Sequence, residues 1–201
     1  AKEVGISRSN AYNSLASMVD KGAAYLQNGN TSKYIAVNVS EFCGNKIRNL
    51  QNDKKDLEDN LKVKEETEGY MTILGYQNIK DKIANMLKSV EKRVYISIAK
   101  ERLNLFHETI VQLICDEKKV VIITDSKPDI KNCNIYISDS LMENQIRLIV
   151  DSKYVLTGDF GDSKEDTCLY SGQKNFVNLF KDAMRNEIEL IKLRSGNDYE
   201  N

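Results

Sequence analysis

From residue 69 onward the chain alternates between apolar runs that suit strands and amphipathic stretches that suit helices. The runs RVYISIA (93–99) and KVVIIT (119–124) are typical of buried strands, and an amphipathic helix is expected between them over 101–117. Further strands are expected at 134–138, 145–151, 154–158 and 167–171. A strand–helix–strand unit, then consecutive strands, then a long helix over 176–193 predicts a mixed sheet flanked by helices, of the α+β or mixed α/β class.

The composition is ordinary for a soluble globular protein, with 41% hydrophobic and 29% charged residues. A length of 201 residues suits one large domain or two small ones. The net charge of −1 provides no global basic field, although a local basic patch is enough for nucleic-acid binding.

Several classes of protein are not expected. No apolar run approaches the length of about 20 residues that crosses a bilayer, and no signal peptide opens the chain, so a cytoplasmic location without a membrane partner is predicted. Cys43, Cys115, Cys133 and Cys168 form no CxxC pair, so neither a metal site nor a disulfide framework is expected. No cofactor is expected either, since the chain carries no Gly-rich phosphate loop.

The strongest local pattern lies at the beginning of the chain. Gly5 suits the positive φ of a tight turn between helices, and Ser7 is a good N-cap for the helix that follows. Apolar residues then recur at helical spacing until Gly22 ends the helix: Ala11, Leu15, Met18 and Val19. This order predicts a helix-turn-helix whose second helix enters the major groove of DNA.

A hairpin is expected directly after this helix. Residues 23–27 and 33–39 read as strands, and the loop NGNTS between them contains the favoured turn pair Asn28-Gly29. Helix, glycine and hairpin in this order predict a winged helix-turn-helix over residues 1–40. Because the motif is already half complete at Ala1, we expect this domain to be truncated at its N-terminus.

Polar residues of this segment are candidates for DNA contacts, because their side chains can donate to phosphates and base edges. Those of the helix are Ser7, Arg8, Ser9, Asn10, Tyr12 and Asn13. The hairpin adds Thr31, Ser32 and Lys33 for contacts with the DNA backbone. The alternative is that all of these are solvated surface residues of a small helical domain.

The stretch GISRSNAYNSLASMVDKGAAYLQNGNTSKYIAV resembles the TrmB family of transcriptional regulators. The resemblance rests on Gly5-Ile6-Ser7-Arg8, Tyr12, Lys21-Gly22 and Tyr34-Ile35-Ala36-Val37, whereas Asn38 stands where the family often has proline. It implies binding to double-stranded DNA at an operator.

A helix is expected over residues 41–68, where strong helix formers dominate and proline is absent. Its three-four spacing forms a short seam: Ile47, Leu50, Lys54, Leu57, Leu61, Lys64 and Glu68. The seam favours a coiled-coil contact in a homodimer. A solvated linker helix, or one that packs on the neighbouring domain, is the alternative.

Residues 69–193 resemble the phospholipase-D-like domain that TrmB-family proteins often carry. Active enzymes of that fold have His-x-Lys-x4-Asp-Gly where this chain has NQIRLIVDS, followed by a strand that ends in glycine. With Asp151 at the position of the motif's Asp, Asn144 stands at the His position and Ile146 at the Lys position. Gly158 matches the strand-terminal glycine. Neither the nucleophile nor the cation of phosphoryl transfer is present, so no enzymatic activity and no catalytic residue is expected.

A pocket without catalysis can serve as a ligand site. The candidate lining residues are Asn144, Arg147, Asp151 and Asp159, although in a strand Arg147 would point away from Asn144. The family resemblance implies a sugar or related metabolite as the small-molecule effector. The alternative is ordinary strand and turn surface. Residues 194–201 are expected to form a polar tail.

These patterns favour a DNA-binding regulator in which an effector in the C-terminal domain shifts the placement of two winged helices. Two alternatives stay open. The first is a phosphodiesterase or nuclease of phospholipase-D type, and the second is a protein-interaction module that binds no DNA.

Overall fold

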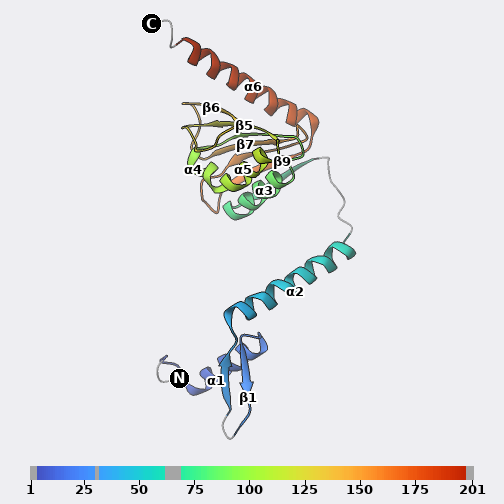
Figure 1. Cartoon of the computed structure of the whole chain (residues 1–201), viewed down its shortest axis with the longest axis vertical. Helices are drawn as coiled ribbons and strands as arrows, with labels where there is room; N and C mark the ends of the chain where they lie inside the picture. Colours follow the sequence, from blue (N-terminus) through green and yellow to red (C-terminus); the bar gives the residue numbers. More distant parts are fainter. Residues whose placement is uncertain (1–3, 30–31, 62–68, 198–201) are drawn as a thin grey trace. The chain divides into compact units, whose positions relative to one another are not determined.

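The computed structural model describes residues 4–29, 32–61 and 69–197, and the chain divides into two compact units, residues 1–64 and 65–201 (Figure 1). Each unit is described by itself. The three boundaries expected from the sequence, after residues 40, 68 and 193, stay a prediction. No helix in the described ranges combines the length and apolar character needed to cross a membrane.

Helix α1 of the first unit, Arg8–Asp20, begins and ends where local chemistry predicts. The Ser7 hydroxyl accepts the backbone N–H of Asn10 at 3.2 Å, which caps the first turn. At the other end Gly22 has φ 74° and donates its N–H to the Val19 carbonyl, while Ala23 donates to the Met18 carbonyl. This pair of bonds is a Schellman motif, which needs the left-handed conformation that glycine adopts without strain.

Strands β1 (Ala24–Gln27) and β2 (Lys33–Ala36) form the expected antiparallel hairpin. Gln27 pairs with Lys33, so the strands end on either side of the predicted loop 28–32, of which residues 30 and 31 lie outside the described residues. No described residue of α1 is buried, because a hairpin of two short strands covers only part of its apolar face.

Helix α2, Val39–Asn60, is shorter than the predicted helix over 41–68. Asn38 caps its start by accepting the N–H of Ser40. The last turn carries Glu58 and Asp59 and no basic residue, and negative charge at a helix C-terminus is unfavourable. Leu61 already has an extended backbone, and Lys64 and Glu68 of the predicted seam lie outside the described residues.

The second unit is built on a seven-stranded mixed sheet with the strand order β3-β9-β8-β7-β4-β5-β6. Neighbours from β3 to β4 are antiparallel, and β4, β5 and β6 are parallel. The strands are β3 (Tyr70–Leu74), β4 (Arg93–Ser97), β5 (Lys119–Thr124), β6 (Asn134–Ile137), β7 (Gln145–Val150), β8 (Tyr154–Asp159) and β9 (Thr167–Ser171). The predicted mixed sheet flanked by helices is confirmed.

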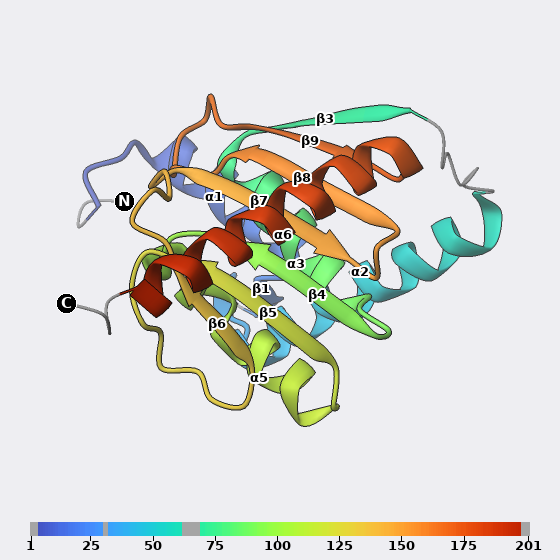
Figure 2. The ribbon, with the colours of Figure 1, turned by 90° about the horizontal axis from the view of Figure 1, so that it is seen from above.

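Helices cover both faces of this sheet (Figures 1 and 2). Helices α3 (Tyr76–Lys88) and α5 (His107–Cys115) pack on one face, over a core that includes Ile83, Ile96 and Leu148. Helix α6 (Lys174–Asn197) crosses the other face diagonally and packs on a smaller apolar cluster that includes Ile149 and Met184.

The helix predicted over residues 101–117 is not continuous. The stretch 101–117 is divided into α4 (Lys100–Leu103), a 3-10 turn η1 (Asn104–Phe106) and α5. Leu103 and Phe106 are both buried, and the tighter turn brings side chains three residues apart onto one line facing the core.

Gly158 in β8 marks the closest approach between two strands. Its φ is 148°, and a Cβ there would lie 2.2 Å from the Thr167 carbonyl oxygen of β9. Only glycine fits because the obstacle is backbone of the paired strand.

We therefore expect Gly158→Ala to lower the free energy of unfolding of the second unit by about 3 kcal/mol, through strain and a forced shift of β9. Urea unfolding followed by circular dichroism measures this. Gly44→Ala is the control, because nothing lies within 4 Å of a Cβ at Gly44. Equal unfolding curves for both variants would contradict the assigned contact between β8 and β9.

Candidate functional site

The polar face of α1 is open to solvent. Arg8, Asn10 and Asn13 are exposed, as is Ser9, and 63% of Tyr12 is exposed. Ser7 is also exposed, but its hydroxyl oxygen is engaged in capping the helix. The face therefore offers a guanidinium, two amides and two hydroxyls for contacts outside the unit.

The hairpin lies beside the first turns of α1. A shallow hollow of about 410 Å³ lies between them, lined by Arg8, Ala11, Tyr12, Leu15, Ser32 and Tyr34. Ser32 and Lys33 are exposed, whereas Thr31 lies outside the described residues. The unit thus brings predicted residues of the helix and of the hairpin to one surface.

The electrostatics of this surface suit an anion. Neither Arg8 nor Lys33 has an ion-pair partner among the described residues. The N-terminus of α1 adds the partial positive charge of the helix dipole beside Arg8.

In the second unit, the four predicted ligand residues do not form one cleft. Asn144 precedes β7 and Asp159 ends β8, and the pairing of Gln145 with Asp159 makes them neighbours. Asp151 lies in the turn at the other end of β7. Seven residues of extended chain separate Asn144 from Asp151, which span about 23 Å at about 3.3 Å per residue. The expectation of a shared cleft for these two residues is corrected.

The corner around Asn144 is held by neighbouring backbone. Its carbonyl accepts the N–H of Phe160 at 2.6 Å, and a Cβ on Gly161 would come within 2.9 Å of its amide carbon. Arg102 donates to the Gly161 carbonyl, and the buried Asp166 carboxylate accepts the N–H of Gly161.

This corner provides no phosphoryl-transfer chemistry at the two aligned positions. Asn144 has an uncharged amide, and Ile146 is fully buried in the core. Within the described residues, no group of three or more His, Cys, Asp or Glu side chains is placed to hold a metal ion. Burial, with the charges of Asp159 and Asp166, raises the pKa of the nearby Cys168 to about 12, so its thiol stays protonated at neutral pH.

Arg147 points to the face opposite Ile146, as strand alternation predicts. Its guanidinium is 2.6 Å from the Glu187 carboxylate of α6 and donates to the Ser97 hydroxyl of β4 at 2.9 Å. Both charged side chains are about four-fifths buried, with 22% and 19% exposed. Arg147 therefore anchors α6 on the sheet.

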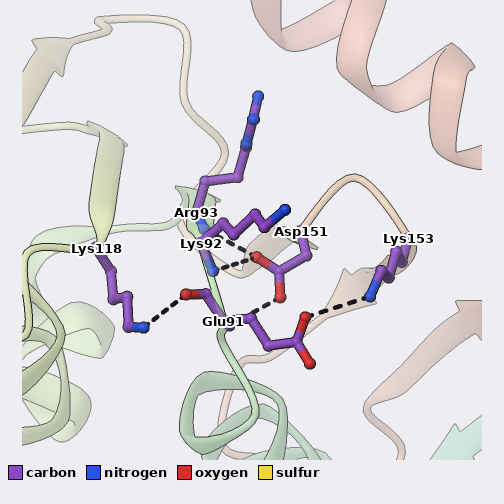
Figure 3. A network of polar contacts seen from close by, with 6 residues as sticks. All are labelled: Glu91, Lys92, Arg93, Lys118, Asp151 and Lys153. Carbon is purple, nitrogen blue, oxygen red and sulfur yellow. Dashed lines mark hydrogen bonds and ion pairs between the residues drawn. The ribbon is translucent and has the colours of Figure 1, made fainter.

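Asp151 joins the β7–β8 turn to the start of β4 (Figure 3). Its carboxylate accepts the backbone N–H groups of Glu91, Lys92 and Arg93 at 2.8–2.9 Å. Lys153 in turn pairs with the Glu91 carboxylate at 3.4 Å. The three hydrogen bonds that the Asp151 carboxylate accepts all come from the protein's own backbone, so Asp151 is a structural clamp.

The clamp changes the acidity of Asp151. Burial by itself raises the pKa of the carboxyl group, but the hydrogen bonds from Glu91, Arg93 and Lys92 and the charge of Lys153 outweigh burial. Together they hold the pKa below its ordinary value of 3.8.

Sequence reasoning missed a groove beside α6. It has a volume of about 280 Å³, an apolar lining that includes Tyr95 and Ile188, and three cations, Lys181, Arg185 and Lys192. The sequence does show that the three cations are spaced along one flank of the helix. This spacing does not indicate which residues of the sheet lie opposite them.

Comparison with known proteins identifies a similar overall structure. The chain resembles TrmBL2. TrmBL2 is an archaeal chromatin protein whose structure shows a novel mode of DNA binding. The TM-score is 0.52 at 18% identity, and the likeness covers 92% of this chain and 82% of TrmBL2. At this identity the likeness concerns the fold.

Further similarities are weaker. NucT from Helicobacter pylori has a TM-score of 0.46 at 13% identity, covering 61% of this chain and 98% of that one. Nuc from Salmonella typhimurium, a phospholipase D family member, has a TM-score of 0.47 at 11% identity, covering 59% and 93%.

In sequence, no family model matches the chain. The uncharacterized protein YrhO of Bacillus subtilis is 27% identical over 166 residues, which cover 79% of this chain. The match covers 59% of YrhO, so this chain spans about three fifths of the length of that relative.

We expect Asp151→Asn to lower the free energy of unfolding by about 2 kcal/mol near neutral pH, because hydrogen bonds to a charged group are worth about 1.5–3 kcal/mol. Since the folded pKa lies below 3.8, this stabilisation is present above pH 3.8 and is lost as the pH falls through the folded value. Urea unfolding should show that the difference between wild type and variant shrinks as the pH is lowered below 3.8.

Asp81→Asn is the matched control, because the exposed Asp81 carboxylate accepts only the Gln77 amide among the described residues. A pH-independent difference for Asp151→Asn, or an equal loss for the control, would contradict the clamp.

Proposed function

We propose that the chain is a DNA-binding transcriptional regulator related to the TrmB family, acting in the cytoplasm. The observation that carries the proposal is the exposed polar face of α1, with Arg8 and Asn10 on the helix and Lys33 on the adjoining hairpin. A helix of this kind can read base edges in the major groove while the hairpin contacts phosphates. The fold likeness to TrmBL2, an archaeal chromatin protein with a novel mode of DNA binding, supports it.

Residue roles follow from side-chain chemistry. Arg8 is proposed to contact guanine or phosphate, and Asn10 and Asn13 to contact adenine. Ser9 and Tyr12 supply hydroxyl donors, and Ser7 holds the helix start toward the DNA. Ser32, Lys33 and Thr31 are proposed to contact the DNA backbone.

The DNA assignment is tested by fluorescence anisotropy with a labelled duplex from the promoter region of the chain's own gene, at several salt concentrations. Arg8→Ala is expected to weaken binding about tenfold and to reduce the salt slope by about one. Lys127→Ala is the control, since it removes an exposed charge of the second unit. Equal affinities for wild type and Arg8→Ala, or binding insensitive to salt, would contradict the assignment.

A homodimer is proposed to form through α2. Ile47, Leu50 and Leu57 are 58%, 70% and 56% exposed, so the apolar seam is without a partner among the described residues of its own unit. Pairing two such helices would bury the seam and place two α1 helices in one two-fold assembly, as a palindromic operator requires.

We expect Leu50→Glu to shift the chain from dimer to monomer in sedimentation velocity at micromolar concentration, because the added carboxylate would face its own copy across the seam. Gln51→Glu adds the same charge beside the seam and should leave the dimer intact. A monomeric wild-type chain, or a dimer unaffected by Leu50→Glu, would contradict pairing through α2.

The second unit is proposed to bind a small-molecule effector without catalysing a reaction. The corner of Asn144 and Asp159 supplies the amide and carboxylate that would bind the hydroxyl groups of a sugar, the class that the resemblance implies. Asp151 and Arg147 are engaged within the fold, so the proposal now rests on Asn144 and Asp159.

A further inference from the structure

The groove beside α6 combines an apolar lining with positive charge. Helix α6 crosses the sheet diagonally, so the starts of β4 and β5 lie beside the helix and not under it (Figure 2). The groove lies on this flank and has a volume of about 280 Å³. Its apolar lining comes from Tyr95, Ile149, Met184 and Ile188, of which Tyr95 and Ile188 are only half-buried. These two side chains offer apolar surface to a ligand, and covering that surface favours binding.

Three cations of α6 line the same groove, and the only carboxylate among its lining residues is Glu189. Arg185 pairs with Asp182, whereas Lys181 and Lys192 have no ion-pair partner among the described residues. Lys181 is half-buried, so water and salt screen its charge less than that of a fully exposed lysine. The flank of the helix therefore leaves uncompensated positive charge beside apolar surface.

The sheet adds two cations beside the groove. Side chains two residues apart in a strand lie on the same face, so Arg93 shares the face of Tyr95. Lys119 of β5 pairs with Arg93 in parallel register and lies on this face too. Figure 3 shows the Arg93 side chain pointing away from the network around Asp151. Neither Arg93 nor Lys119 has an ion-pair partner within the described ranges, so both add to the positive field.

Charge and size together define the ligand. The volume lies just below the range of about 300–1,000 Å³ that holds drug-sized ligands, so one or two rings or a short acyl chain fit. A sugar is a poor match, because none of the eight described lining residues has an amide side chain to bind its hydroxyl groups. Inorganic phosphate and the phosphates of DNA have no apolar body to cover Tyr95 and Ile188.

We propose that this groove binds a small organic carboxylate. Its apolar body packs against Tyr95 and Ile188, and its carboxylate faces the cations of the α6 flank, chiefly the unpaired and half-buried Lys181. Ile149 lies five residues along β7 from Asn144, about 16 Å at about 3.3 Å per residue. The groove is therefore separate from the corner of Asn144 and Asp159, and the inference does not rest on the proposed function.

NMR of the full chain with labelled isoleucine and methionine methyl groups tests the site, with 2-naphthoate as the probe. We expect shifts at Ile149, Met184 and Ile188 and a Kd on the order of 1 mM or below. The uncharged analogue 2-naphthamide has the same ring system and should bind at least about tenfold more weakly, because it lacks the carboxylate. Octanoate is titrated in parallel, and the tighter of the two carboxylates shows whether the groove prefers an aromatic or an acyl body.

Variants of α6 test the role of charge. Lys181→Gln should raise the Kd for 2-naphthoate about fivefold or more, and added salt should weaken binding to the wild type. Lys174→Gln is the matched control, because Lys174 is exposed on the same helix and does not line the groove. If Lys181→Gln does not fold, Lys192→Gln makes the same test at an exposed position.

Several results would overturn the proposal. Equal affinities for 2-naphthoate and 2-naphthamide would show that charge does not select the ligand, and so would equal effects of Lys181→Gln and Lys174→Gln. The groove is also not the site if neither carboxylate causes methyl shifts at about 10 mM, or if amide shifts appear only around Asn144 and Asp159. Loss of duplex affinity in Lys181→Gln without any naphthoate binding would assign this surface to DNA. Naphthoate binding is measured without DNA, so failure of the regulator proposal would be recognised separately.

Discussion

The carboxylate of Asp151 holds the second unit together at the place where its two kinds of sheet meet. From β3 to β4 all neighbouring strands are antiparallel, and from β4 to β6 they are parallel. Asp151 lies at the end of β7 and accepts the N–H groups of three residues that lead into β4. This contact ties the end of β7 to the start of β4 and stabilises the register of the central strand pair.

Side chains alternate along a strand, so β7 presents two chemically different faces. Ile146 and Leu148 enter the core under α3 and α5, while Arg147 reaches Glu187 and fixes α6 on the opposite face. The positions aligned with the His and Lys of the phospholipase-D-type motif hold an exposed asparagine, Asn144, and a buried isoleucine, Ile146. This difference supports the proposal that the second unit binds an effector without catalysing a reaction, since function resides in the site and not in the fold.

Local chemistry explains what the sequence could predict. The caps at Ser7 and Gly22 and the apolar runs of β4 and β5 are short-range signals, and the structure has elements at these places. The role of Asp151 could not be predicted, because its partners lie about sixty residues away and meet it only through sheet register. Asn144 and Asp151 are only seven residues apart in the sequence, but strand β7 lies between them and places them at its two ends. The groove beside α6 depends on which sheet residues lie opposite the helix, which the sequence does not indicate.

The central claim is that DNA is bound through α1 and the hairpin of the first unit. Amide-resolved NMR of the full chain, with and without duplex DNA, tests it most directly. The account predicts chemical-shift changes concentrated at residues 7–13 and 32–33, with the β4–β7 centre of the second unit unchanged. Changes confined to the second unit, or no changes at saturating duplex, would contradict it.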